Sequence, residues 1–383
     1  MTSRARVMTV YGTRPEAIKV APVVRAIEAS ERLQSVTVVT GQHREMLDQV
    51  NEIFGIVPDV DLDVFAHGQG LNQLMAKLFE RLDPVLATDP PDALLVQGDT
   101  STVAAAAVAA FYRQIPVVHL EAGLRSGDIH SPFPEEANRK ITSQVTSLHL
   151  APTASARDNL TREDIAGNSI AVTGNTVIDA LLHTVEQNLP FTDPRLAHLE
   201  ESRTPVLLVT THRRESWGEA MHGVGRALRR LAERYPEVVT VLPAHRNPVV
   251  REAVLPYVEG LSNVIVTEPL AYGEFTRLMA AATVVLTDSG GVQEEAPSLG
   301  KPVLVMRENT ERPEAVAAGT VRLIGTDEER IVAEVSELFD DADAYGRMAT
   351  AVNPYGDGEA SQRCVAAIEH MLLGTPRATD FAG

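Results

Sequence analysis

The chain has 383 residues, 44% of them hydrophobic and only 4% aromatic, which is typical of a globular protein with two domains of ordinary size and aliphatic cores. Its formal net charge of −18 excludes general binding to nucleic acids or to anionic membranes, so an anionic ligand requires a local basic cluster. The single cysteine, Cys364, excludes an intrachain disulfide and a cysteine-based metal site.

The start of the chain predicts a cytoplasmic protein. Residues 1–6 lead into a short strand without the apolar core of a signal peptide. The most apolar helical segment, 103–111, is too short to span a bilayer and is followed by Arg113.

The first predicted strand, 7–11, is followed by Gly12-Thr13-Arg14-Pro15-Glu16. Thr13 and Glu16 have the spacing of a capping box, and Pro15 suits the first turn of a helix. Arg14 and Lys19 therefore lie near the positive end of a helix, where a bound anion would explain them, although solvent-exposed cations are the alternative. No G-x-G-x-x-G follows this strand, so the dinucleotide-binding fingerprint is absent.

Further strands in the first half are predicted at 36–40, 93–97, 115–120, 148–152 and 170–175. Helical segments alternate with them, which indicates a parallel, doubly wound sheet. The polar segment 41–45 after the second strand either contacts a ligand or forms a solvated turn.

Three carboxylates in this half are candidate catalytic groups. Asp99 and Glu121 follow two consecutive strands, which are usually neighbours in a sheet, and Glu135 lies in the first turn of a later helix. An acidic residue in a first helical turn is often only a complement to the helix dipole. We nevertheless expect all three carboxylates to converge.

The strand pattern restarts after a polar, proline-containing stretch at 179–204, which we interpret as a connection between domains. Strands of the second half are predicted at 205–210, 238–242, 264–266, 283–286 and 302–306. Basic side chains follow several of these strands, namely His212, Arg213, Arg246, Arg307 and Arg312. Their repeated position at strand ends favours an anionic ligand.

The stretch Thr287–Pro297 is the most informative segment of this half. Ser289 is placed as a helix N-cap, and Gly290 and Gly291 open the helix, so backbone N–H groups are available to a phosphate. Glu295 lies about one turn further, where its carboxylate suits the hydroxyls of a ribose. The alternative is a strand–turn–helix corner in which the glycines serve packing alone.

We therefore predict two Rossmann-like doubly wound parallel-sheet domains that face a cleft. The predicted boundaries are 1–172 for the domain with the carboxylates and 173–360 for the nucleotide-binding domain. A C-terminal helix at 361–375 is expected to pack back on the first domain, and 376–383 to be a frayed tail. Cations in one half and carboxylates in the other suit a nucleotide sugar.

The chain also resembles the bacterial non-hydrolysing UDP-N-acetylglucosamine 2-epimerases, which have the GT-B fold. The resemblance extends over nearly the whole chain and rests on segments in the same order, namely 12–16, 41–48, 97–100, 119–125, 133–139, 211–215, 287–297 and 310–314. It implies reversible conversion of UDP-GlcNAc to UDP-ManNAc for polysaccharide or related pathways, without a cofactor or a metal, by a homodimer.

Carried over by position, the resemblance implies roles for individual residues. The implied catalytic residues are Asp99, Glu121, Glu135 and His212. The implied substrate-binding residues are Arg14, Lys19, Arg213, Ser289, Gly290, Gly291, Glu295 and Arg312. Some members bind a second UDP-GlcNAc as an activator, at positions that match Gln42, His43 and His245. Glu45 is a further candidate for this site, although some members have glutamine at its position.

The chemistry agrees with these roles. The C2 proton of the sugar is not adjacent to a carbonyl group, so it becomes acidic only when UDP leaves C1. The resulting glycal is then protonated at C2 from the other face, and UDP adds back. This route requires cations at the diphosphate and carboxylates near C2. The alternatives are a GT-B glycosyltransferase, a hydrolysing epimerase and a catalytically silent nucleotide-sugar sensor.

Overall fold

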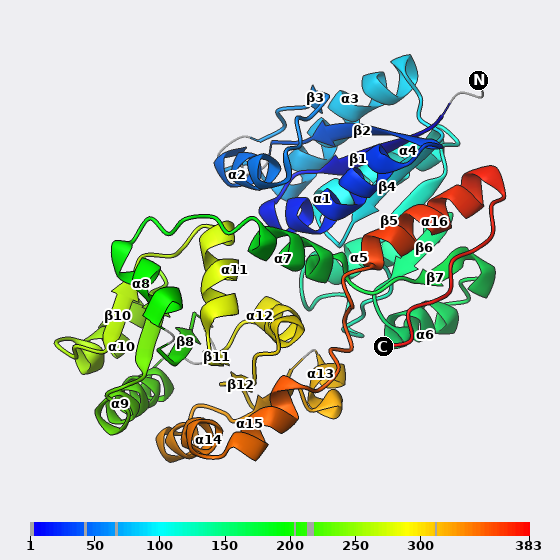
Figure 1. Cartoon of the computed structure of the whole chain (residues 1–383). Helices are drawn as coiled ribbons and strands as arrows, with labels where there is room; N and C mark the ends of the chain where they lie inside the picture. The colour runs from blue at the N-terminus through cyan, green and yellow to red at the C-terminus, as the bar shows by residue number, and fades with distance from the viewer. Residues whose placement is uncertain (1–3, 42–43, 66–67, 203, 213–217, 311) are drawn as a thin grey trace. The chain divides into compact units, whose positions relative to one another are not determined.

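The computed structural model describes residues 4–41, 44–65, 68–202, 204–212, 218–310 and 312–383 (Figure 1). The chain forms two compact units, one of Met1–Ala180 with Tyr355–Gly383 and the other of Leu181–Pro354. The chain thus leaves the first unit between Ala180 and Leu181 and returns at Tyr355, whereas the sequence suggested 172/173 and 360/361.

The first unit contains a sheet of seven strands in the order β3-β2-β1-β4-β5-β6-β7. All of its paired strands are parallel. Their bounds are β1 Ala5–Tyr11, β2 Leu33–Val39, β3 Val60–Asp61, β4 Ala93–Gln97, β5 Val117–Leu120, β6 Leu148–Ala151 and β7 Ile170–Val172. The two-residue strand β3 was not predicted from the sequence. The order reverses between β1 and β4, where ligands bind in open α/β sheets.

Helices cover both faces of this sheet, as Figure 1 shows. The helices of this unit are α1 Arg14–Ala29, α2 Arg44–Phe54, α3 Leu71–Thr88, α4 Ser101–Tyr112, α5 Glu135–Val145, α6 Ala154–Arg162 and α16 Ala360–Leu373. Helix α7, Thr176–Glu186, begins in the first unit and ends in the second. α3 and α4 share a buried core with Met8, Val10 and Val96. α1 packs with α2 and α16. Because alternate side chains of a strand point to opposite faces, each strand contributes to both cores.

The second unit contains a six-stranded sheet in the order β10-β9-β8-β11-β12-β13, again with parallel pairing. Its strands are β8 Val206–Thr210, β9 Val239–Pro243, β10 Val264–Thr267, β11 Val284–Thr287, β12 Val303–Val305 and β13 Val321–Leu323. The order reverses between β8 and β11. The two predicted doubly wound parallel sheets are therefore confirmed. The strand β13 was not predicted from the sequence.

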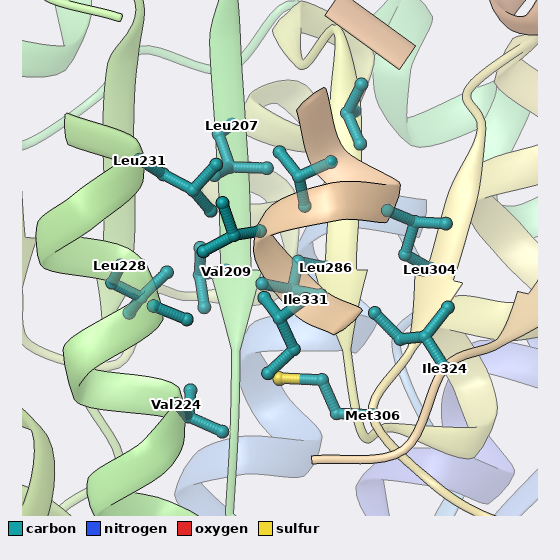
Figure 2. Close-up of a cluster of buried hydrophobic side chains, with 14 of the residues drawn as sticks. Leu207, Val209, Val224, Leu228, Leu231, Leu286, Leu304, Met306, Ile324 and Ile331 are labelled. Atoms are coloured by element: carbon teal, nitrogen blue, oxygen red, sulfur yellow. The ribbon is translucent and has the colours of Figure 1, made fainter. Parts of the chain in front are cut away.

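The second unit encloses an aliphatic core on one face of its sheet. Its helices are α8 Pro194–Ser202, α9 Glu219–Arg234, α10 Pro248–Val258, α11 Tyr272–Ala281, α12 Gly290–Glu295, α13 Pro313–Ala318, α14 Glu328–Asp340 and α15 Ala342–Ala349. Figure 2 shows Leu207 and Val209 of β8 packed between Leu228 of α9 and Ile331 of α14. Burial of such side chains stabilises the unit by roughly 1.5–3 kcal/mol each.

The chain passes from the first unit to the second inside the segment 179–204, which was interpreted as the connection between domains, but the segment is largely helical. The segment contains most of α7 and all of α8. Ile178 and Leu181 of α7 are buried, as is Leu196 of α8, so both helices contribute to cores. The polar residues and prolines between the apolar positions concealed this helical pattern.

The end of the chain is held against β7 and is not frayed. The backbone N–H of Phe381 donates to the carbonyl of Val172 at 2.8 Å, and the Asp380 carboxylate accepts the N–H of Val172. The guanidinium of Arg363 on α16 lies over the ring of Phe381. These contacts were invisible to the sequence analysis because they join segments about 200 residues apart.

Candidate functional site

Glu121 lies directly after β5, at the carboxyl edge of the first sheet, and is surrounded by hydrogen-bond donors. Nζ of Lys19 on α1 lies 2.5 Å from Oε1, and the side-chain amide of Gln97 donates to Oε2. The amide of Asn175 also donates to Oε1, at 3.3 Å. Glu121 has a left-handed φ of 61°, which is uncommon for a residue with a Cβ and turns its side chain at the strand end.

Asp99 follows the neighbouring strand β4 and is paired with a cation. Nη2 of Arg139 on α5 contacts Oδ2 of Asp99 at 2.5 Å, and the side-chain amide of Asn138 donates to the Asp99 carbonyl. Burial raises the pKa of Asp99, Arg139 opposes that shift, and the charge of Glu121 adds to it. The two predicted carboxylates therefore interact, in a setting that includes Lys19 and Arg139.

The N-terminus of α1 contains the predicted capping box, with Thr13 as N-cap and Pro15 in the first turn. The carboxylate of Glu16 accepts the N–H groups of Gly12 and Thr13, at 2.8 and 2.7 Å, and the hydroxyl of Thr100. Glu16 is buried and joins the turn after β1 to the start of α4. An internal carboxylate therefore occupies the helix end where the sequence suggested a bound anion, and Arg14 is exposed.

Glu135, the third predicted carboxylate, is half-buried in the first turn of α5. It lies four residues before Arg139, so both belong to one face of that helix. Its neighbour Glu136 is fully buried and accepts hydrogen bonds from Arg139 and from the backbone of Ser126. Glu136 therefore orients the guanidinium that contacts Asp99, a role that the sequence analysis missed.

In the second unit, Asp288 organises the carboxyl ends of β8 and β11. It is fully buried, and its Oδ2 accepts the hydroxyl of Thr211 at 3.0 Å and the N–H of His212 at 2.8 Å. Nδ1 of His212 lies 2.9 Å from Oδ1 of Asp288, and the His212 ring is about two-fifths exposed. The ring of the exposed His245 stacks on that of His212, with centroids 5.9 Å apart.

The predicted glycine turn is confirmed as a helix start, with Ser289 as the N-cap of α12. The Ser289 side chain makes no capping hydrogen bond, and its N–H donates to the hydroxyl of Thr287. Nε of Arg312 donates to Glu294 at 2.7 Å, and its Nη1 would lie 2.7 Å from a Cβ added at Gly290. A side chain at position 290 would therefore displace the guanidinium of Arg312.

Glu295, at the end of α12, is buried, and the hydroxyl of Tyr272 donates to its Oε1 at 3.5 Å. Gly291 is exposed on the same helix. Five predicted substrate-binding residues therefore lie on or beside α12 in the second unit, namely Ser289, Gly290, Gly291, Glu295 and Arg312.

Some predicted residues fall outside the described part of the chain. These are Arg213, Gln42 and His43. Glu45 is part of α2, but its side chain is outside the description as well. Of the predicted activator site, only the His245 side chain is described.

Sequence reasoning missed several polar partners, namely Gln97, Asn175, Arg139 and Asp288. Asp288 lies inside the stretch Thr287–Pro297, and its position between a buried strand and an N-cap was a usable signal. Gln97 is the last residue of a buried strand, where a polar side chain is unusual. Asn175 offered no comparable signal.

Behind the first-unit site lie two buried histidines, His119 on β5 and His149 on β6, which are partners in the strand register. Burial lowers the pKa of His119 to about 4 and that of His149 to about 3, so both imidazoles are neutral near pH 7. The unfolded chain binds these protons near pH 6.5, so the two histidines destabilise the fold as the pH falls below that value.

Replacing His149 by Leu is therefore expected to flatten the pH dependence of stability. Between about pH 7 and pH 5 the variant loses about 2 kcal/mol less of its free energy of unfolding than the wild type does. Urea titrations at the two pH values measure this difference. Equal losses in both proteins would contradict the assignment of His149 as a buried neutral group.

The helices in the described part of the chain include none with the length and hydrophobicity needed to cross a membrane.

The chain is similar to known proteins over nearly its whole length. The family model described as UDP-N-acetylglucosamine 2-epimerase matches residues 25–369. A UDP-N-acetylglucosamine 2-epimerase of Escherichia coli strain K12 is 50% identical over 381 residues, which cover 96% of this chain and 99% of that protein.

Solved structures give the same result. A crystal structure of a UDP-N-acetylglucosamine 2-epimerase is similar with a TM-score of 0.93 and 45% identity, covering 100% of both chains. The UDP-GlcNAc 2-epimerase of Neisseria meningitidis, solved with UDP-GlcNAc bound, is similar with a TM-score of 0.82 and 44% identity. That match covers 97% of this chain and 100% of the other.

Proposed function

The chain belongs to the UDP-N-acetylglucosamine 2-epimerase family, as a non-hydrolysing isomerase with the GT-B fold, and from this premise we propose a route for the inversion at C2 of UDP-GlcNAc. UDP leaves C1 while a carboxylate removes the C2 proton, which gives UDP and a glycal. Protonation of C2 from the other face and re-addition of UDP to C1 then give UDP-ManNAc.

The observation that carries this proposal is the pair Asp99 and Glu121 at the ends of adjacent strands, each in contact with a cation. Removal of a proton from one face of C2 and delivery to the other requires two groups in different protonation states. Interacting carboxylates titrate in separate steps, so one holds a proton while the other is ionised. The raised pKa of Asp99 agrees with such a division.

In this route Lys19 and Arg139 keep the carboxylate pair close to electrical balance. Without these cations the pKa of each carboxyl would rise, and the ionised fraction that can act as a base would fall. Lys19 contacts Glu121 directly, and Arg139 contacts Asp99. We assign Glu135, one turn before Arg139, as a third acid/base group of the sugar site.

In the second unit, we assign the diphosphate to Ser289, Gly290 and Gly291, and the ribose to Glu295. The Ser289 hydroxyl, which makes no capping hydrogen bond, and the exposed Gly291 support this assignment, because phosphate accepts hydrogen bonds from hydroxyl and backbone N–H groups. Arg312 lies over Gly290 and supplies positive charge. His212, which is oriented by Asp288, protonates or hydrogen-bonds the departing diphosphate, and we also assign Arg14 and Arg213 to the nucleotide sugar.

Replacing Gly290 by Ala is expected to raise KM for UDP-GlcNAc about 10-fold, with a smaller change in kcat. The new Cβ would displace the Arg312 guanidinium from its position beside Glu294, which weakens diphosphate binding by about 1.4 kcal/mol. Steady-state kinetics measure the change.

The matched control for that variant is Gly346→Ala on α15, where nothing lies within 4 Å of an added Cβ. It is expected to retain wild-type KM and kcat. If Gly290→Ala had the wild-type KM, the proposed role of Arg312 in diphosphate binding would be contradicted.

We further propose that a second UDP-GlcNAc binds near His245 and activates the enzyme, with Gln42, His43 and Glu45 as the other contacts. The stacking of His245 on His212 supports this, since occupancy at one ring then alters the other. A sigmoidal rate curve in UDP-GlcNAc, and no turnover of UDP-ManNAc alone, are the expected results. We also propose a homodimer that supplies ManNAc units for cell-surface polysaccharide.

Incubation of the protein with UDP-GlcNAc in D₂O, followed by NMR at C2, tests the activity. Deuterium at C2 of UDP-GlcNAc and UDP-ManNAc, with the nucleotide retained, is the expected result. Free ManNAc would indicate a hydrolysing enzyme, and no exchange at C2 would leave a glycosyltransferase or a sensor.

A further inference from the structure

His119 occupies an unusual place for a polar side chain, inside the buried strand β5 and two residues before Glu121. Its side chain is fully buried. Nε2 lies 2.7 Å from the carbonyl oxygen of Gly98, which can only accept a hydrogen bond, so Nε2 carries the proton. Nδ1 has no hydrogen-bond partner in the described part of the chain.

The carbonyl that accepts this hydrogen bond belongs to the turn that carries Asp99. Gly98 has a φ of 82°, so the chain turns sharply between Gln97 and Asp99. The N–H of Gly98 donates to Leu120 of β5, and its carbonyl accepts from His119 of the same strand. Both hydrogen-bonding groups of this one glycine are therefore fixed to β5, immediately before Glu121.

His149 provides an internal comparison. It lies beside His119 in the sheet register, is equally buried, and also has an Nδ1 without a partner in the described part of the chain. In the part of the chain that the structure describes, no hydrogen bond joins His149 to Gly98, Asp99 or Glu121. Burial of a neutral imidazole in this core therefore does not by itself require the contact that His119 makes.

We infer that His119 is a positioning residue for the epimerisation, which holds the Gly98–Asp99 turn against β5 so that the Asp99 and Glu121 carboxylates keep a fixed separation. This inference rests on the proposed roles of the two carboxylates. A displacement of about 1 Å in a catalytic group can reduce the rate of a reaction about 100-fold. The loss of the Nε2–H donor is therefore expected to affect the chemical step and to spare binding of the nucleotide, which we assign to the second unit.

The test compares substitutions that keep or remove a donor at the Nε2 position. His119→Leu is expected to lower kcat, and the rate of C2 deuterium exchange, about 100-fold, with KM for UDP-GlcNAc within about threefold of wild type. His119→Gln, whose amide nitrogen reaches the Nε2 position, is expected to recover most of that loss. His149→Leu is the matched control and is expected to retain wild-type kcat.

A second pair keeps the test decisive if His119→Leu does not fold. His119→Asn has the same polarity as His119→Gln, but its amide nitrogen corresponds to Nδ1, so it is expected to be about as impaired as the Leu variant. Equal kcat for the Gln and Asn variants, equal losses in His119→Leu and His149→Leu, or a loss that appears in KM alone would overturn the inference. Absence of C2 exchange in the wild-type protein would instead contradict the proposed function.

Discussion

Replacing Asp99 by Asn lowers the rate of deuterium incorporation at C2 of UDP-GlcNAc by about 1,000-fold, within the range that acid–base catalysis contributes. The amide is nearly isosteric but cannot accept or deliver the proton. It also leaves the Arg139 guanidinium without the anion that it contacts at 2.5 Å. NMR in D₂O measures the rate, and affinity for UDP should remain close to wild type.

The control for this variant is Asp83→Asn on α3, which removes another Asp–Arg pair. Asp83 contacts Arg113 on the surface, and its side chain is 60% exposed. Exposed pairs of this kind contribute about 0–1 kcal/mol, so the control should retain full activity. If Asp99→Asn turned over at the wild-type rate, Asp99 would have no part in the proton transfers.

Replacing Asp288 by Asn lowers kcat by about 100-fold, because His212 loses its orienting carboxylate. Asp288 is buried and accepts from the hydroxyl of Thr211 and the N–H of His212, while its other oxygen lies 2.9 Å from Nδ1 of His212. An amide presents one acceptor and one donor where three donor groups converge. The imidazole then adopts the wrong tautomer or orientation, as in other His–Asp pairs.

Steady-state kinetics test this effect, with Asp340→Asn on α14 as the control. Asp340 also accepts hydrogen bonds, from Tyr235 and Arg234, but these join the C-terminal ends of α9 and α14. The account predicts a loss in Asp288→Asn that His212→Ala does not deepen, since the two residues act as one unit. Additive losses would show that Asp288 acts independently of His212.

Much of the fold was readable from the sequence because its strands are buried on both faces. Segments such as 93–96 and 284–286 are continuous apolar runs, which is the pattern of a parallel sheet. β3 escaped prediction because it is only two residues long, at the sheet edge. β13 has three residues with a central Arg322, which ion-pairs with α14, so its pattern was too short to recognise.

The sequence predicted only those parts of the candidate site that follow from the order of the strands. Asp99 and Glu121 end consecutive strands, and their proximity follows from the parallel pairing of β4 and β5. The partners Gln97, Lys19 and Asn175 depend on side-chain directions across three different elements, which no local pattern specifies. The capping of the α1 N-terminus by Glu16 is local and follows from the predicted capping box, whereas the contact of Glu16 with Thr100, 84 residues away, could not be predicted.

The central claim is that the bond between C1 and the nucleotide oxygen breaks before C2 is reprotonated. UDP-GlcNAc labelled with ¹⁸O in that bridging position tests it most directly, because released UDP can rotate its terminal phosphate before it adds back. The account predicts that the label moves into non-bridging positions of the β-phosphate in substrate that has been through the reaction. Full deuterium exchange at C2 with all of the ¹⁸O still in the bridge would contradict it.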